Sequence, residues 1–323
     1  MRVLITGGAG FVGSHLADAL LARGESIVIY DDFSTGRESN IAHLAERSDV
    51  TVVRGDIRDE LHVNRVMGGV DACFHLAAAV GVNLIVEEPL RSLTTNIRGS
   101  EVVLGAAEYF KVKTLVTSTS EIYGKNTSDV LREGDDRILG SPLKVRWTYS
   151  EAKAIEEALA YTLWEQSGLP TIIARLFNTV GPRQTGHYGM VVPRFVASAL
   201  AGDPVTVYGT GDQSRVFCHV QDAVAGLLSL WDDERTHGDV FNVGGVGEIS
   251  MNQLAERVIA NTGSTSEIVH IPYEQAYEPG FEDMQRRVPS TEKIKGMTGW
   301  QPKRTLDDII RDVAEYQRST GTR

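Results

Sequence analysis

Residues 146–153 read R-W-T-Y-S-E-A-K and place Tyr149 and Lys153 four positions apart. At the start of a helix, this spacing puts both side chains on one face. A phenol has a pKa of ~10 in water and is a poor base at neutral pH, but a neighbouring positive charge stabilises the phenolate and lowers that pKa. Such a tyrosine can take the proton from a hydroxyl while hydride leaves the same carbon. The spacing also arises by chance, so the pair needs partners.

A second polar cluster follows the apolar run that begins near Thr114. The run ends in T-S-T-S-E, which includes Thr119, Ser120 and Glu121. Ligands of open parallel sheets bind beyond the carboxyl ends of the strands. Hydroxyls and a carboxylate there are hard to explain as core, although a polar strand end that caps the next turn is the alternative. The predicted catalytic set is therefore Thr119, Ser120, Glu121, Tyr149 and Lys153.

A glycine-rich loop lies at residues 7–13, between an apolar run and a helical pattern, and reads G-G-A-G-F-V-G. Its spacing is G-x-x-G-x-x-G, which permits a tight turn and lets backbone amides approach a pyrophosphate at the positive end of a helix. Glycines of such turns can also be merely structural. The loop residues predicted to contact a dinucleotide are Gly7, Gly10, Phe11, Val12 and Gly13.

The next strand pattern ends in Asp31 and Asp32, where a ribose-binding carboxylate is expected. A carboxylate there accepts hydrogen bonds from both hydroxyls of an adenine ribose and repels a 2′-phosphate, so NAD is favoured over NADP. Arg37 is the counter-evidence, since an arginine could hold that phosphate. In the later G-D-I run, Asp56 and Ile57 are candidate adenine contacts, and a simple turn is the alternative.

The elements that must position these residues alternate between β-branched runs and helical patterns, as in a parallel sheet covered by helices. The first helical pattern has Leu16 and Leu20 on one face, and Gly24 follows as a C-cap. The runs are apolar throughout, as strands buried on both faces should be. The predicted strands span residues 3–6, 27–30, 50–53, 72–76, 114–118 and 171–176. We expect a Rossmann-type, doubly wound parallel sheet with helices on both faces.

After residue 176 the alternation of strand and helix patterns becomes less regular, with more Gly and Pro and shorter predicted strands. Pro193 opens a predicted helix, residues 215–219 read as a strand that leads into a helix, and Ser250 with Gln253 forms a capping-box signal. We predict an NAD-binding domain over residues 1–177, to which 215–245 returns. A smaller mixed α/β nucleotide-sugar-binding domain is predicted over 178–323.

Composition narrows the class of protein. The 323 residues are 42% apolar and 23% charged, as in globular proteins. A formal net charge of -11 argues against a nucleic-acid partner, and the sequence has neither a basic run for an anionic membrane nor an apolar run of spanning length. A strand pattern at residue 2 leaves no room for a leader. A cytoplasmic protein with no metal site is expected.

Taken together, the motifs resemble the extended short-chain dehydrogenases that act on nucleotide sugars, over nearly the whole chain. The shared motifs are the glycine loop, F-H-L-A-A at 74–78, Asn96, T-S-E-I-Y-G at 119–124, Y-x-x-x-K, R-L-F-N-T-V-G-P-R at 175–183 and the D-Q-S-R run ending at Arg215. Within the family, Thr119-Ser120-Glu121 most resembles UDP-glucuronate decarboxylases. Typical 4-epimerases have a small residue in place of Glu121, whereas GDP-mannose 4,6-dehydratases share the Ser-Glu pair.

The resemblance implies roles for individual residues. It implies Thr119 as hydroxyl partner of the sugar 4-oxygen, Tyr149 as base and Lys153 as holder of the nicotinamide ribose. It also implies NAD contacts at Leu76, Ala77, Ala78 and Asn96, and substrate contacts at Asn178, Arg183, Val192, Tyr208, Arg215 and Arg287. Arg215 and Arg287 suit a diphosphate because a guanidinium donates two bonds in a fork. Tyr208 could flank a uracil ring or be an ordinary half-buried tyrosine, and Arg183 could be a surface charge.

The implied activity is decarboxylation of UDP-glucuronate through a 4-keto intermediate, giving UDP-4-keto-pentose or UDP-xylose with NAD regenerated. A UDP-hexuronate or UDP-hexose 4-epimerase, a 4,6-dehydratase and a non-catalytic NAD-sensing module are the alternatives. The resemblance also implies a homodimer through the helix of Tyr149 and the helix near residues 95–109. On the former, Ile155, Leu159 and Leu163 form an apolar stripe that could face a partner or the sheet.

Overall fold

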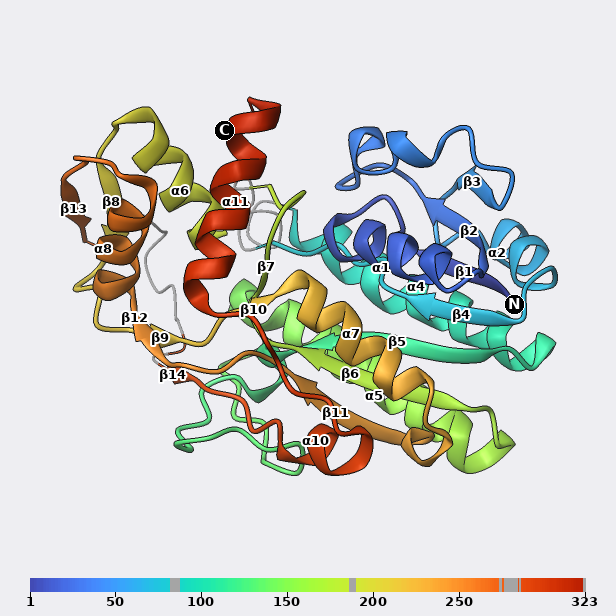
Figure 1. Cartoon of the computed structure of the whole chain (residues 1–323). Coiled ribbons are helices and arrows are strands. Elements are labelled where there is room, and N and C mark those ends of the chain that lie inside the picture. Colours follow the sequence, from blue (N-terminus) through green and yellow to red (C-terminus); the bar gives the residue numbers. More distant parts are fainter. Residues whose placement is uncertain (82–87, 186–189, 273–274, 276–283, 285, 322–323) are drawn as a thin grey trace.

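A seven-stranded sheet lies at the centre of the larger of the two cores of the molecule (Figure 1). The computed structural model describes residues 1–81, 88–185, 190–272, 275, 284 and 286–321. Every neighbouring pair of strands in this sheet is parallel. In sheet order the strands are β11 (Asp239–Val243), β6 (Thr171–Leu176), β5 (Lys113–Thr119), β4 (Ala72–His75), β1 (Arg2–Thr6), β2 (Ser26–Asp31) and β3 (Val50–Arg54). The predicted doubly wound sheet is therefore confirmed.

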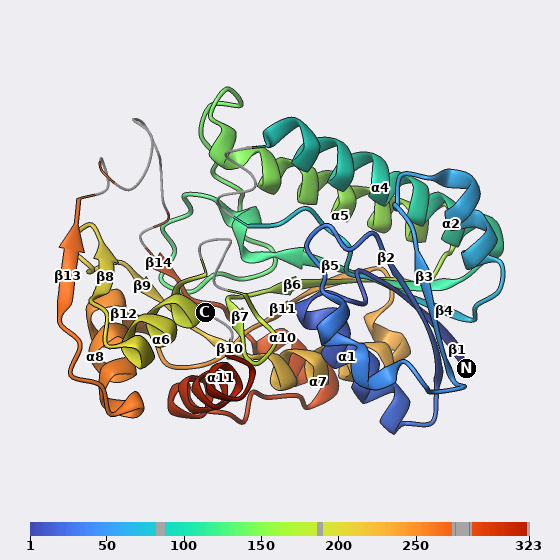
Figure 2. The same cartoon turned by 90° about the horizontal axis from the view of Figure 1, so that it is seen from above.

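Helices cover both faces of the sheet, as seen from above in Figure 2. One face carries α2 (Glu60–Met67), α4 (Pro89–Phe110) and α5 (Thr148–Ser167), and the other carries α1 (Phe11–Ala22), α7 (Val220–Trp231) and α10 (Glu292–Thr298). Leu16 and Leu20 are buried in the α1 layer, and Gly24 has the positive φ expected of a residue that ends a helix.

One strand departs from the expected burial. β3 lies at the edge of the sheet, and its Val52 side chain is 45% exposed. The prediction that all strands are buried on both faces is wrong for this strand. An edge strand has a neighbour on only one side, so its side chains are less completely covered.

The late part of the chain builds a second, smaller core of mixed α/β structure. Here β8 (Val205–Tyr208) pairs in parallel with β13 (Ile268–Ile271), and α6 (Val191–Ala201), α8 (Met251–Thr262) and α11 (Leu306–Thr320) pack around them (Figure 1). The predicted capping box is present, because Ser250 and Gln253 exchange hydrogen bonds at the start of α8.

Short strands connect the two cores, and here the prediction of one strand over 215–219 is wrong. Arg215 belongs to a three-stranded sheet in the order β12 (Ile249–Ser250), β9 (Ser214–Arg215), β14 (Arg286–Arg287), whereas β10 (Cys218–His219) pairs with β7 (Thr179–Val180). The chain therefore crosses between two sheets at residues 216–217. The 3-10 turns are η1 (Glu38–Asn40), η2 (Ala42–Leu44), η3 (Ser120–Tyr123), η4 (Val145–Trp147) and η5 (Glu234–Thr236).

The return of the chain to the large sheet is visible in the pairing. Within residues 215–245, β11 extends the large sheet beside β6, and α7 packs on its face. The boundary at residue 177 stays a prediction. Among the described residues, we find no helix that combines the length and the apolar character needed to cross a membrane.

Candidate active site

A cleft opens at the carboxyl ends of β1, β2 and β4, where the strand order reverses. Its floor is the glycine loop, which leaves no room for side chains. A Cβ on Gly13 would lie 2.2 Å from the carbonyl oxygen of Gly7, and a Cβ on Gly7, whose φ is +72°, would lie 2.7 Å from the backbone nitrogen of Ala77. The backbone is therefore exposed to the cleft at the start of α1, as a pyrophosphate site requires.

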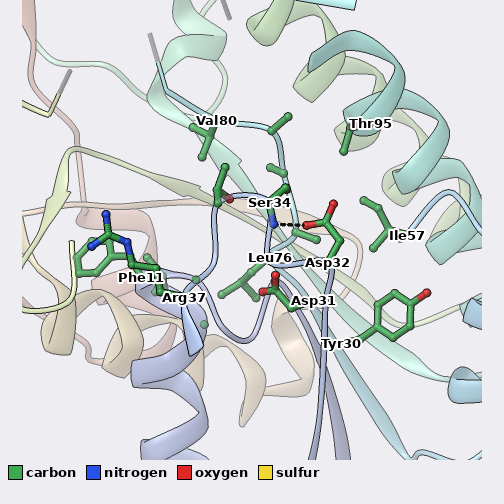
Figure 3. Close-up of a pocket in the computed structure, with 18 of the residues that line it drawn as sticks. Phe11, Tyr30, Asp31, Asp32, Ser34, Arg37, Ile57, Leu76, Val80 and Thr95 are labelled. Atoms are coloured by element: carbon green, nitrogen blue, oxygen red, sulfur yellow. Dashed lines mark hydrogen bonds between the residues drawn. The ribbon is translucent and has the colours of Figure 1, made fainter. Parts of the chain in front are cut away.

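Asp31 lies buried at the end of β2, beside this loop. Its carboxylate accepts hydrogen bonds from the backbone nitrogens of Ala9 (2.9 Å) and Phe33 (2.8 Å). Burial raises the pKa of Asp31, while these two bonds act against the rise. Each carboxylate oxygen has a second lone pair free for a ribose hydroxyl. Figure 3 shows both aspartates between Ile57 on one side and Phe11 on the other.

Most residues predicted to bind the cofactor line this cleft together. They are Gly7, Gly10, Phe11, Val12, Gly13, Asp31, Asp32, Asp56, Ile57, Leu76, Ala77 and Ala78. Arg37 also lines the cleft, but its guanidinium donates to the hydroxyl of Thr185 at 3.0 Å. Asn96 is not among the lining residues. It is buried on α4 and holds the backbone of Ala79 through both its amide atoms, so it shapes the cleft from behind.

A second cleft continues from the first and runs over the ends of β5 and β6. Every residue of the predicted catalytic set lines it, and so do most of the predicted substrate contacts. These residues are Thr119, Ser120, Glu121, Tyr149, Lys153, Asn178, Val192, Tyr208, Arg215 and Arg287. Residues more than 150 positions apart in the sequence thus share one wall.

Lys153 is almost fully buried on α5. Its ammonium donates to the carbonyl oxygen of Thr117 at 2.9 Å and to the Glu156 carboxylate at 2.8 Å. Burial raises the pKa of Tyr149, and the charges of Glu156 and Glu121 raise it further. This differs from the expectation that Lys153 lowers the pKa of Tyr149, because burial is the largest cause of the rise and the Glu156 charge adds to it.

Glu121 is gripped by two arginines at the end of β5. Arg146 donates to its Oε2 at 2.5 Å and Arg287 donates to its Oε1 at 2.6 Å. Burial would raise the pKa of Glu121, but Arg287, Arg146 and Arg215 together outweigh it and lower the pKa to about 2. Glu121 is therefore an anion at neutral pH.

Arg287, predicted to contact a diphosphate, directs its guanidinium to Glu121 and to the Ser120 hydroxyl (3.3 Å), and its contact with substrate stays a prediction. Its Nε is buried and, among the described residues, has no hydrogen-bond partner. Arg183 departs further from its prediction as a substrate contact. It pairs with Asp18 at 2.8 Å and lines the first cleft, not the second.

The remaining predicted contacts sit around the second cleft. Asn178 donates to the carbonyl oxygen of Val216 at 2.8 Å and has a φ of +33°. Val192 is buried on α6, and the Arg194 guanidinium lies 4.4 Å from the ring centre of Tyr208. Arg215 lies close enough to Glu121 to lower its pKa. These residues line the same cleft as Tyr149.

Two residues of the site, Arg146 and Glu156, were not predicted from the sequence. Arg146 lies in the same motif as Tyr149, three positions before it, and the cation there was the overlooked signal. Glu156 follows Lys153 by three positions, so a helix places the two on one face. From the sequence alone, a glutamate at this position is expected to be a solvent-exposed charge. Only the packing of α4 over α5 shows that it is buried.

The chain matches the family model described as GDP-mannose 4,6-dehydratase over residues 4–313. It belongs to this family, within the extended short-chain dehydrogenases that act on nucleotide sugars. A UDP-N-acetyl-alpha-D-glucosaminuronate decarboxylase of Bacillus cytotoxicus is 38% identical over 320 residues, 98% of either chain. UDP-glucuronic acid decarboxylase 1 of Xenopus tropicalis is 34% identical over 319 residues, which are 98% of this chain and 72% of the relative.

Solved structures with related sequences have the same fold. A UDP-glucuronic acid 4-epimerase from Bacillus cereus, in complex with UDP-glucuronic acid and NAD, superposes with a TM-score of 0.89 at 26% identity and covers 99% of each chain. A UDP-glucose 4-epimerase from Thermotoga maritima with UDP-glucose has a TM-score of 0.88 at 30% identity, again with 99% of each chain covered.

Proposed function

We propose that this protein binds NAD in the first cleft and decarboxylates UDP-glucuronate in the second. The observation that supports this best is the anionic Glu121, held by Arg146 and Arg287 in the wall that also carries Tyr149. The site fits the cofactor, since the glycine loop exposes its backbone for a pyrophosphate and Asp31 can accept the ribose hydroxyls. NAD, when bound, supplies the hydride acceptor for C4 of the sugar and the donor that restores it.

The chain's own residues handle protons and charge. Tyr149 takes the proton of the C4 hydroxyl, and Thr119 orients that hydroxyl. The C4 ketone turns the C6 carboxylate into a β-keto acid, whose C5–C6 bond breaks to release carbon dioxide. The electron pair left on C5 is delocalised into the ketone as an enolate, and protonation at C5 then gives a 4-keto-pentose. Reduction of its ketone gives UDP-xylose.

Charge at the C6 end is the special feature of this site. Arg287 lines the second cleft and suits the substrate carboxylate, because a guanidinium can bind a carboxylate in a fork. Glu121 then faces that carboxylate as a like charge, and the repulsion disappears when carbon dioxide leaves, a contested form of catalysis. A pKa of about 2 makes Glu121 a poor proton donor on its own. Proton delivery to C5, directly or through a water, would require substrate binding to raise that pKa.

UDP-N-acetylglucosaminuronate is the second candidate substrate, because a relative named for that activity is 38% identical. Both sugars carry the C6 carboxylate that Arg287 would bind, and they differ at C2. A 4-epimerase would use the same oxidation and then rotate the keto sugar, and a 4,6-dehydratase would use Glu121 to take the C5 proton. A UDP-hexose 4-epimerase and a 4,6-dehydratase have no substrate carboxylate for Arg287 to bind, whereas a UDP-hexuronate 4-epimerase shares that carboxylate, so the products distinguish it from a decarboxylase.

The test is incubation of the purified protein with each UDP-hexuronate, followed by chromatography and mass analysis. We expect a UDP-pentose species that has lost the mass of carbon dioxide. Conversion of UDP-glucuronate only to UDP-galacturonate, with no carbon dioxide released, would replace the decarboxylase by the epimerase. Consumption of UDP-glucose or a GDP-hexose alone would overturn the substrate class.

We also propose a homodimer formed through α4 and α5. These helices lie side by side on one face of the sheet (Figure 2) and expose Leu90, Tyr109, Ile155 and Tyr161. Of the predicted stripe, Leu159 and Leu163 pack on the sheet side, which leaves Ile155 outward. Large exposed apolar side chains on neighbouring helices favour association. Light scattering at micromolar concentration should give the dimer mass, and a monomer mass would contradict the proposal.

A further inference from the structure

A chain of hydrogen bonds runs behind the catalytic lysine, from the ends of β1 and β4 to α5. The backbone nitrogen of Ala77 donates to the Thr6 hydroxyl (3.3 Å), and that hydroxyl lies 2.6 Å from Nδ1 of His75. Nε2 of His75 lies 3.2 Å from the hydroxyl of Ser100. Ser100 donates to Oε2 of Glu156 at 2.9 Å, where the chain meets the ammonium of Lys153.

All of these hydrogen bonds run in one direction, from donor to acceptor towards Glu156. Burial, helped by the charge of Lys153, lowers the pKa of His75 to about 3, so the imidazole is neutral. Since Ser100 gives its proton to Glu156, it accepts one from Nε2 of His75, and Nδ1 then accepts from Thr6. Two donors, the Ser100 hydroxyl and the Lys153 ammonium, thus converge on one carboxylate oxygen of Glu156. The hydrogen bonds therefore fix the place of the Glu156 carboxylate beside Lys153.

Glu156 and Lys153 are respectively 1% and 2% exposed, so little water screens their interaction. Within the part of the chain that the structure describes, Glu156 and the carbonyl oxygen of Thr117 use two of the three ammonium donors of Lys153, and one remains for the cleft that Lys153 lines. A balanced ion pair exerts much less net pull on a nearby phenol than a lone ammonium does. The Lys153 ammonium is therefore held beside the cleft while Glu156 balances most of its charge.

We propose that Glu156 is a positioning residue that sets the pH at which Tyr149 can act as a base. It holds the Lys153 ammonium in place and balances its charge, so that Tyr149 stays protonated at neutral pH until a further positive charge enters the cleft. The proposal rests on the proposed function for the role of Tyr149 as base. It goes beyond that function because Glu156 touches neither cleft.

Other charges around this pair leave Glu156 as the group that balances Lys153. On α5 itself, Glu157 pairs with Arg175 of β6 at 2.7 Å. From α4 comes the neutral Ser100, and from β4 the neutral His75. Glu121 of η3 also raises the pKa of Tyr149, but its charge is opposed by Arg146, Arg215 and Arg287.

The test compares Glu156→Gln with Glu157→Gln, its neighbour. Removing the Glu156 charge leaves the Lys153 ammonium unbalanced, which stabilises the Tyr149 phenolate. The rising limb of the pH profile for reduction of bound NAD should move to lower pH by about one unit or more. Glu157→Gln removes the neighbouring carboxylate, which is 12% exposed and pairs with Arg175 instead of Lys153, so its limb should not move. An unmoved limb in Glu156→Gln, a shift to higher pH, or an equal shift in Glu157→Gln would overturn the proposal.

A second measurement needs neither substrate nor cofactor. The tyrosinate absorbance of Tyr149 is obtained after rapid pH jumps, read before the protein unfolds, as the difference from the matching Tyr149→Phe protein. Its midpoint should lie at lower pH in Glu156→Gln than in the parent protein, and equal midpoints would contradict the proposal. If the parent protein reduces no NAD with either UDP-hexuronate, the proposed function fails, and this measurement still decides the role of Glu156.

Should Glu156→Gln fail to fold, Glu156→Asp takes its place. Aspartate keeps the charge but withdraws it by one methylene, which weakens its interaction with Lys153. The tyrosinate midpoint should then fall by a smaller step than the one expected for glutamine, and an unmoved midpoint would overturn the proposal.

Discussion

The two ends of the continuous cleft are built in different ways. The cofactor end, made by residues 7–13 and Asp31, uses backbone groups of one short loop and a carboxylate at the next strand end. The reaction end brings together Glu121, Arg146 and Arg287 from three separate segments. The glycine loop and Asp31 of the cofactor end lie within the first 31 residues, and residues 56–57 and 76–78 complete its lining. The reaction end exists only once both cores have packed.

This difference separates binding from chemistry. A cofactor site made of backbone and one carboxylate tolerates changes in the second core. A reaction site made of opposite buried charges depends on each partner, because removal of one leaves the others unpaired in a poorly screened place. Variants at the two ends should therefore affect different steps.

The largest expected effect is that of Tyr149→Phe. The ring stays but the proton acceptor is lost, so sugar oxidation should fall by ~10²–10⁴-fold, as is usual for loss of a positioned base. NAD content, measured after denaturing the purified protein, should remain that of the parent because Tyr149 lies outside the glycine loop. Near-normal turnover would remove the proposed mechanism from consideration.

Glu121→Gln tests whether the reaction end acts after oxidation. No step of C4 oxidation needs the Glu121 carboxylate, so reduction of bound NAD by UDP-glucuronate should persist in the nicotinamide absorbance band. Release of UDP-pentose should fall on the order of 10²-fold, the usual scale for a positioned charge or proton donor. UDP-galacturonate is an expected side product, from keto sugar that survives long enough to rotate. Equal loss of both steps would show that Glu121 serves oxidation as well.

Acid should weaken the folded protein through the same residue. The pKa of Glu121 is about 2 in the folded state, below its ordinary value of 4.5. Its stabilising contribution is therefore complete above that ordinary value and is lost as the pH falls toward 2. The size is about 3 kcal/mol. Urea unfolding of the parent and of Glu121→Gln should show a gap that narrows between pH 5 and pH 3, and a constant gap would contradict this assignment.

Asp31→Ala probes the cofactor end. Loss of a carboxylate that accepts from ribose hydroxyls should weaken NAD binding by about 10–100-fold, the range of one or two charged hydrogen bonds. NADP binding should weaken less, because the like charge that repels its 2′-phosphate is also gone. Titration with both dinucleotides measures the two effects, and equal losses would mean that Asp31 does not discriminate between them.

The smallest effect is expected at Arg286, the neighbour of Arg287. Arg286 pairs with Glu248 and Asp129 at the surface, where its side chain is 40% exposed. Arg286→Ala should change the free energy of unfolding by less than about 1 kcal/mol and leave KM unchanged. Arg287→Ala, the matched variant, should abolish pentose formation. Similar kinetics of Arg286→Ala and Arg287→Ala would contradict the assignment of Arg287 to the site and of Arg286 to the surface.

The same contrast explains what the sequence could predict. The glycine loop and Asp31 are close in sequence, and their roles follow from a local strand–turn–helix pattern. The pairing of Tyr149 with Lys153 follows from helical spacing. The Glu121–Arg287 contact joins residues 166 positions apart, so no local pattern contains it. Glu156 was missed because burial of a glutamate depends on which helix packs over it, here α4.

The sheet also has a consequence for synthesis of the chain on the ribosome. The N-terminal part, although it holds the whole nucleotide loop, cannot complete its own sheet, because β11 emerges more than sixty residues after β6. Until residue 243 is made, β6 is an unpaired and largely apolar edge strand. Such an edge can pair with a strand of another nascent chain. Of the small core, only α6 and β8 are translated during this interval, because α8, β13 and α11 follow β11 in the sequence. A fragment ending at residue 177 should therefore pellet on centrifugation, whereas the full chain should not.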